Sequence, residues 1–182
     1  MNSHEVKLHL GCGDRFIPGF IHIDIVPGEF IDYSHDIQTL PMFENEEVDL
    51  IYASHVLAYF DWVEVIDVLR EWHRVLKTNG TLRLATPDFD ALIELYREHG
   101  IAPLLGSLYG RIEAGDRLLY HHMVYNYSSL SLALRLVGFR NIRPWDWHSV
   151  EHAEIDDCSQ SYYPHMNKDV GLFLSLNVEA TK

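Results

Sequence analysis

The sequence predicts an α/β fold built on a doubly wound, mostly parallel sheet. One basis is a short apolar strand, Val6 to Leu10, that runs directly into the glycine turn Gly11-Cys12-Gly13. The other is the alternation of strand-like and helix-like segments along the residues that follow. Strands that alternate with helices are typical of a parallel sheet with helices on both faces.

The glycine turn indicates a nucleotide-type site. Gly11 and Gly13 lack a Cβ, so the chain can turn sharply there and bring its backbone against a ligand at the carboxyl edge of the sheet. A P-loop needs Gly-Lys-Ser/Thr at the end of the turn, where this chain has Asp14-Arg15-Phe16. A dinucleotide fingerprint needs a third glycine where Phe16 stands, which disfavours a nicotinamide-dependent oxidoreductase.

Strands and a helix continue the alternation after the turn. Phe20 to Ile25 and Val48 to Ala53 are short apolar strands, with a third candidate strand just before Asp36. Asp61 to Lys77 is the clearest helix, with Asp61 as the N-cap and Asn79-Gly80 as the stop. Its predicted apolar face comprises Trp62, Val65, Ile66, Leu69, Trp72 and Leu76.

The next segments extend the pattern. Thr81 to Ala85 is the fifth strand, and Thr86-Pro87-Asp88 begins a helix that Gly100 ends, with Asp88 twice as readily a helix cap as a catalytic group. Ser128 to Val137 alternates leucines as a strand would, yet its serine start and the Gly138 stop favour a helix. Phe139 to Trp147 and Leu172 to Thr181 are the last two strands.

Two segments are expected to be insertions on the substrate side of one domain that spans 1–182. Residues 101–127 are interrupted by glycines and rich in Leu, Tyr, Met and His. Residues 149–171 are long for a connection between neighbouring strands, and loops of that length in compact domains are usually functional or disordered. We expect the second segment to form a substrate wall or lid.

Composition and charge exclude several classes of function. The chain has 182 residues, 47% of them apolar, enough for one core and too few for two ordinary domains. Its net charge of -13, with 14 scattered basic residues, argues against a nucleic-acid surface. No apolar run predicts a membrane span, and Met1 to Val6 does not resemble a signal peptide. Cys12 and Cys158 predict neither a metal site nor a disulfide, so we expect a cytoplasmic protein.

Five motifs in order resemble one family. LHLGCG, HIDI, HDIQTLP, VDLIYASHVLAYF and GTLRLATPD look like a class I S-adenosylmethionine-dependent methyltransferase, in particular the small single-domain enzymes of polysaccharide and natural-product biosynthesis. The resemblance covers Val6 to Asp90 and resumes at LALRLVGFRNI and LFLSLNVEATK. It implies a Rossmann-like sheet of seven strands with the last strand antiparallel. The chain departs from the family pattern at His9, Arg15 and Ala58-Tyr59, the last replacing a Glu-His pair.

The resemblance also implies the cofactor and its contacts. S-Adenosyl-L-methionine is expected to meet the backbone of Gly11, Cys12 and Gly13. Its ribose would be bound by Asp24, next to Ile25, through both hydroxyls. The remaining expected contacts are Asp36 and Ile37 at the adenine and Ser54 beside the methionine portion, although Asp36 is almost as readily a turn residue.

Histidines near the site are the candidate catalytic residues. His55 directly follows the fourth strand, and an imidazole can take a hydroxyl proton at neutral pH, although it could equally pack against the cofactor. His122, in the pair His121-His122, could face the substrate. His148 and His152 lie in an acidic stretch that invites a metal hypothesis, but a solvated loop is favoured, so no metal is expected.

These observations predict an enzyme that moves a methyl group from S-adenosylmethionine to a hydroxyl or amine of a small molecule, such as a sugar. The alternative is a non-catalytic module of the same fold that binds the cofactor or a partner chain. The departures at His9, Arg15 and Ala58-Tyr59 motivate this alternative.

Overall fold

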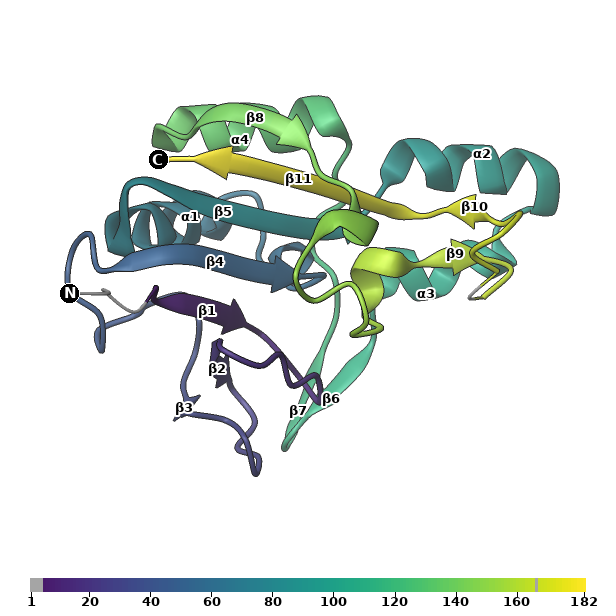
Figure 1. Cartoon of the computed structure of the whole chain (residues 1–182). Coiled ribbons are helices and arrows are strands. Elements are labelled where there is room, and N and C mark those ends of the chain that lie inside the picture. The colour runs from purple at the N-terminus through teal and green to yellow at the C-terminus, as the bar shows by residue number, and fades with distance from the viewer. Residues whose placement is uncertain (1–4, 166) are drawn as a thin grey trace.

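The computed structural model describes residues 5–165 and 167–182, which form a seven-stranded sheet of order β3-β2-β1-β4-β5-β11-β8 (Figure 1). β1 to β5 run parallel to one another, and β11 runs antiparallel to both β5 and β8. This confirms the predicted Rossmann-like α/β sheet with its last strand antiparallel. The strands are β1 (Lys7–Leu10), β2 (Ile21–Asp24), β3 (Tyr33–Ser34), β4 (Val48–Ser54), β5 (Leu76–Pro87), β8 (Arg140–Pro144) and β11 (Ser175–Thr181).

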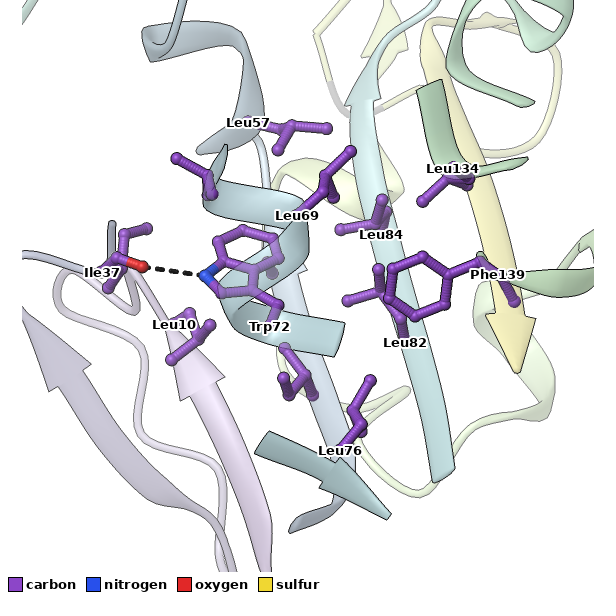
Figure 2. Close-up of a cluster of buried hydrophobic side chains, with 14 of the residues drawn as sticks. Leu10, Ile37, Leu57, Leu69, Trp72, Leu76, Leu82, Leu84, Leu134 and Phe139 are labelled. Carbon is purple, nitrogen blue, oxygen red and sulfur yellow. Dashed lines mark hydrogen bonds between the residues drawn. The ribbon is translucent and has the colours of Figure 1, made fainter. Parts of the chain in front are cut away.

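The main core lies between one face of this sheet and two helices, α1 (Glu64–Val75) and α4 (Tyr127–Val137). Trp72 of α1 is fully buried at its centre, with Leu10 and Leu82 from the strands nearby (Figure 2). Leu134 of α4 closes the same core from the second helix. Apolar residues on one side of each helix and on alternate positions of each strand therefore build this layer.

The start of α1 is capped where the sequence predicts. Asp61 Oδ1 accepts hydrogen bonds from the backbone N–H groups of Val63 (2.7 Å) and Glu64 (2.9 Å), and Glu64 Oε2 accepts from the Asp61 N–H (3.0 Å). This reciprocal arrangement is a capping box. Trp62 was expected on the buried face, but it lies within the cap before the helix and is 73% exposed. The helix ends at Val75 rather than Lys77, because β5 already begins at Leu76.

The opposite face of the sheet differs from the prediction, because no α-helix of the described chain packs on the core there. That core contains Ile17, Phe20 and Trp145, with Val150 and Ile155 from the segment 149–171 packed against it. The connection from β1 to β2, residues 11–20, is too short to hold a crossover helix. The helices expected on this face are therefore replaced by loops and by η3 (Trp147–Ser149) and η4 (Cys158–Gln160).

The remaining elements extend beyond the carboxyl ends of β4 and β5 (Figure 1). Asp88 caps α2 (Phe89–His99) by accepting from the Asp90 N–H (3.0 Å), and Gly100 ends this helix with a φ of 71°. The predicted last strand is interrupted at Leu174, so its first part forms a separate pair with β9. The other short elements are η1 (Leu57–Tyr59), η2 (Ala102–Leu104), α3 (Leu105–Tyr109), β6 (Ile112–Ala114), β7 (Arg117–Leu119), β9 (Tyr162–Tyr163) and β10 (Leu172–Phe173).

The helix at 128–137 begins slightly earlier than predicted. Asn126 rather than Ser128 caps it, since the Asn126 side chain accepts from the Ser129 N–H (3.0 Å) and Ser129 Oγ accepts from the Asn126 N–H (3.1 Å). Gly138 ends the helix in a left-handed conformation, as expected. None of the helices in the described part of the chain combines the length and hydropathy needed to cross a membrane.

Candidate cofactor site

A cavity of about 630 Å³ opens where β1, β2 and β3 end. In open α/β sheets, ligands bind in the crevice outside the carboxyl ends of the strands, and cavities of about 300–1,000 Å³ hold drug-sized ligands. Lining residues come from the glycine turn, the loops after β2 and β3, the segment after β4, and the β6–β7 hairpin. The cavity therefore has the position and size of a nucleoside site.

The glycine turn reaches the cavity through Gly11 and Gly13, whose φ angles are 62° and 55°. Both values lie in the left-handed region that only glycine adopts without strain. A Cβ on Gly11 would lie 2.2 Å from Cγ1 of Val56, so the close approach of the β4 loop also requires glycine there. The turn is held in place by the Gly11 N–H, which donates to the Ile23 carbonyl (2.8 Å).

Asp24 joins the glycine turn to the loop after β2. Its Oδ2 accepts from the Gly13 N–H (2.9 Å), and its Oδ1 accepts from the Val26 N–H (2.9 Å). The side chain lines the cavity although the residue is only 9% exposed. Each carboxylate oxygen has more than one acceptor position, so both retain capacity for a ligand hydroxyl. Ile25 follows directly and also lines the cavity.

Asp36 and Ile37 form another part of the wall. Asp36 Oδ1 accepts from the Gln38 N–H (3.0 Å), which makes it a turn residue as well as a lining residue. The Ile37 carbonyl accepts from Nε1 of the buried Trp72 (2.8 Å), as Figure 2 shows. This hydrogen bond fixes the wall to helix α1 in the main core.

Three predicted site residues are not among those that line the cavity: Cys12, Ser54 and His55. Cys12 is buried, and burial together with the nearby Asp24 raises the pKa of its thiol to about 12. His55 Nε2 lies 3.1 Å from Ser175 Oγ, so the imidazole contacts the first residue of β11. Burial lowers the pKa of His55 to about 3, which keeps the imidazole neutral but makes it a weak base.

His122 does line the cavity. Its backbone N–H donates to the Ala58 carbonyl (2.8 Å), which holds the residue beside the β4 loop. The neighbouring His121 instead packs edge-on against Tyr59 and its Nδ1 lies 2.9 Å from the Ser107 carbonyl oxygen. Of the two adjacent histidines, the structure therefore turns only His122 toward the cavity.

Several lining residues were not predicted from the sequence. Tyr59, Phe60 and Glu64 come from the stretch after β4, and Phe30 comes from the loop after β2. Their only sequence signal is the position of each loop directly after a parallel strand. The hairpin residues Ile112, Glu113, Ala114, Arg117 and Leu119 follow no strand of the main sheet, and the sequence marks them only as part of an insertion.

The lining is acidic. Its carboxylates belong to Asp14, Asp24, Asp36, Glu64 and Glu113, against the single guanidinium of Arg117. Such a surface favours a cationic ligand and repels a polyanion.

His148 and His152, on which the metal hypothesis rested, do not converge. His148 Nδ1 lies 2.7 Å from Asp146 Oδ1 and its ring stacks on Trp147. His152 is buried on the sheet face that carries no α-helix, and the centroid of its ring lies 4.3 Å from that of Tyr52. Of the described residues, none between 149 and 171 lines the cavity.

Part of the sequence matches a known protein family, and the fold matches solved structures. Residues 24–84 match the family model of a methyltransferase domain. This match covers part of the chain, from the end of β2 to within β5. A methyltransferase structure from Archaeoglobus fulgidus is 17% identical, with a TM-score of 0.59 over 98% of this chain and 86% of that one. One from Methanosarcina mazei is 16% identical, with a TM-score of 0.60 over 99% and 93%. At these identities the likeness concerns the fold, and no curated protein matches the sequence.

Both of these solved structures are of S-adenosylmethionine-dependent methyltransferases. The residues that line the cavity fit S-adenosylmethionine. The glycine turn leaves room for a ligand beside its backbone, the Asp24 carboxylate can accept hydrogen bonds from a ribose, and Ile37 provides an apolar wall. The acidic lining also suits the positive charge of a sulfonium.

Proposed function

We propose that this protein is a methyltransferase that moves the methyl group of S-adenosylmethionine to a hydroxyl or amine of a small molecule, such as a sugar. The observation that supports the proposal most strongly is the shared lining of one cavity by Gly11, Gly13, Asp24, Asp36 and Ile37. These residues come from three separate segments of the chain, the turn after β1, the end of β2 and the loop after β3.

In this proposal the glycine backbone and Asp24 bind the sugar of the cofactor, and Asp36 with Ile37 binds its adenine. The bound cofactor supplies an electrophilic methyl group on a sulfonium. Methyl transfer is a direct displacement, so the protein contributes alignment of the nucleophile and exclusion of water. The apolar lining residues Val56 and Phe60 serve the second purpose.

His122 is the proposed base for a hydroxyl acceptor. A neutral imidazole that lines the cavity can take the proton that a hydroxyl loses on methylation, whereas an amine needs only to arrive unprotonated. His55 was the other candidate, and its contact with Ser175 favours a structural role. We therefore assign the acceptor side of the cavity to His122, Tyr59 and Glu64.

The experiment that tests the cofactor site is a calorimetric titration with S-adenosylhomocysteine. Loss of the ribose hydrogen bonds in Asp24→Ala should weaken binding by about 2–4 kcal/mol, because hydrogen bonds to a charged group contribute about 1.5–3 kcal/mol each. Asp32→Ala is the matched control, since Asp32 Oδ2 also accepts a backbone N–H, that of His22 (2.7 Å), but does not line the cavity.

Binding by the parent and by Asp32→Ala, with weak binding by Asp24→Ala, would support the proposal. Equal affinity in all three proteins would contradict the role of Asp24. Tight binding without methyl transfer to any of a panel of hydroxyl and amine acceptors would favour the alternative, a module that binds the cofactor without catalysis.

A further inference from the structure

Tyr59 makes an unusual set of contacts at the base of the β6–β7 hairpin. Its phenol donates to the Gly110 carbonyl (2.6 Å), directly before β6. Its ring packs edge-on against His121, shortly after β7, with 4.7 Å between centroids. One side chain from the β4 loop therefore contacts both ends of the hairpin.

Neighbouring backbone bonds add to this attachment. The Ala58 carbonyl accepts from the N–H groups of His122 (2.8 Å) and Met123 (3.2 Å), and the His121 N–H donates to the Tyr109 carbonyl (2.8 Å). We call the Tyr59, Gly110 and His121 contacts the clasp.

The clasp requires a glycine at position 110. Gly110 has a φ of 49°, and a Cβ there would lie 2.1 Å from Nε2 of His121. Burial raises the pKa of Tyr59 to about 12, so the phenol keeps its proton and remains a donor at neutral pH. The backbone and the side chains thus favour the same arrangement.

The hairpin that the clasp holds is a wall of the cavity. Ile112, Glu113 and Ala114 of β6, with Arg117 and Leu119 of β7, line it opposite the loops of the main sheet. Figure 1 shows the hairpin projecting away from the sheet, close to the loops at the ends of β1 and β2. Because the hairpin pairs with no strand of the main sheet, its position depends on contacts at its base.

We propose that Tyr59 is a positioning residue that holds the β6–β7 hairpin over the bound cofactor as the acceptor-side wall, where Glu113 and Arg117 meet the acceptor. The assignment of an acceptor side rests on the proposed function. Without the Tyr59 phenol, the hairpin opens more often, and the cavity loses its fixed shape on that side.

Hydrogen exchange of the hairpin amides, residues 112–119, tests this in Tyr59→Phe with and without S-adenosylhomocysteine. Loss of one hydrogen bond should speed exchange in the free variant by about 3- to 10-fold, with α4 and β4 unchanged. In the parent, S-adenosylhomocysteine should slow exchange of the same amides, and Tyr59→Phe should lose most of this protection. Tyr127→Phe is the matched control, because Tyr127 donates to the Ile142 carbonyl (3.0 Å) and does not line the cavity.

Hairpin exchange that is equal in Tyr59→Phe and the parent would overturn the proposal, as would faster exchange spread evenly over α1 and the sheet. A parent that binds S-adenosylhomocysteine without protecting the hairpin would also overturn it. A parent that does not bind S-adenosylhomocysteine would contradict the proposed function instead, while the free proteins still test the clasp. If Tyr59→Phe does not fold, Gly110→Ala disrupts the same contacts from the hairpin side.

Discussion

Replacement of Trp72 by Phe should both destabilise the fold and weaken cofactor binding. Trp72 is fully buried, and its indole donates to the Ile37 carbonyl (2.8 Å), which is itself part of a cavity-lining residue. Phe keeps most of the apolar contact but leaves this buried carbonyl without its donor, at a cost of about 1–3 kcal/mol. The smaller ring also gives up roughly 40 Å² of buried surface, or about 1 kcal/mol.

The expected loss in the free energy of unfolding is therefore about 2–4 kcal/mol, measured by urea denaturation at neutral pH. Affinity for S-adenosylhomocysteine should fall by about 3- to 10-fold in the folded variant, because the wall at Ile37 loses one fixed hydrogen bond. Trp62→Phe is the control, since Trp62 is 73% exposed and should change stability by less than about 0.5 kcal/mol. A Trp72→Phe protein as stable as Trp62→Phe would refute the reasoning that the core positions this wall.

Two further predictions concern the glycine turn and the buried imidazole of His9. Gly11→Ala should destabilise the protein more than Gly13→Ala, as thermal melting would show, because both positions have positive φ but only the first Cβ meets an atom, Val56 Cγ1 at 2.2 Å. Equal effects would contradict this. Burial, with His22 and His152 nearby, lowers the pKa of His9 from 6.5 to about 3. The unfolded chain therefore protonates His9 below pH 6.5, whereas the folded protein protonates it only near pH 3. As the pH is lowered from 6.5 to 3, the free energy of unfolding therefore decreases by about 1.4 kcal/mol per pH unit. His9→Leu should show a shallower fall in urea denaturation across this range, and an unchanged slope would count against the assignment.

The positions of most strands along the chain could be predicted because local signals mark them, whereas the antiparallel direction of the last strand was implied by the family resemblance. The strand that enters Gly11 and the apolar face of the helix at 61–77 each need only a short window of sequence. The loops that replace helices on the second face could not be predicted, because their burial depends on Trp145 and Ile155 meeting strands far away in the sequence. The prediction that Trp62 lies on the buried face of the helix was wrong, because the capping box at Asp61 places Trp62 before the first helical turn.

At the site, residues at strand ends were easier to predict than those that approach from elsewhere. Asp24 is the last residue of β2 and Asp36 lies two residues after β3, so topology alone brings them to one edge of the sheet. His55 also follows a strand, but a φ of 55° directs the chain so that its ring meets Ser175. Tyr59 gave no chemical signal, because its partners Gly110 and His121 lie more than fifty residues away along the chain.

The place of β11 between β5 and β8 has a consequence for how the chain acquires its structure. Among the described residues β8 pairs in the sheet with β11 alone, so it joins the rest of the sheet only once β11 is inserted. Until then β5 remains an open edge that could pair with another chain. The sheet therefore closes late, after residues 175–181 have been made, and such non-local pairing is slow compared with helix formation. A protein interrupted before Ser175 would expose two unpaired strands, and we expect aggregation rather than a smaller folded domain.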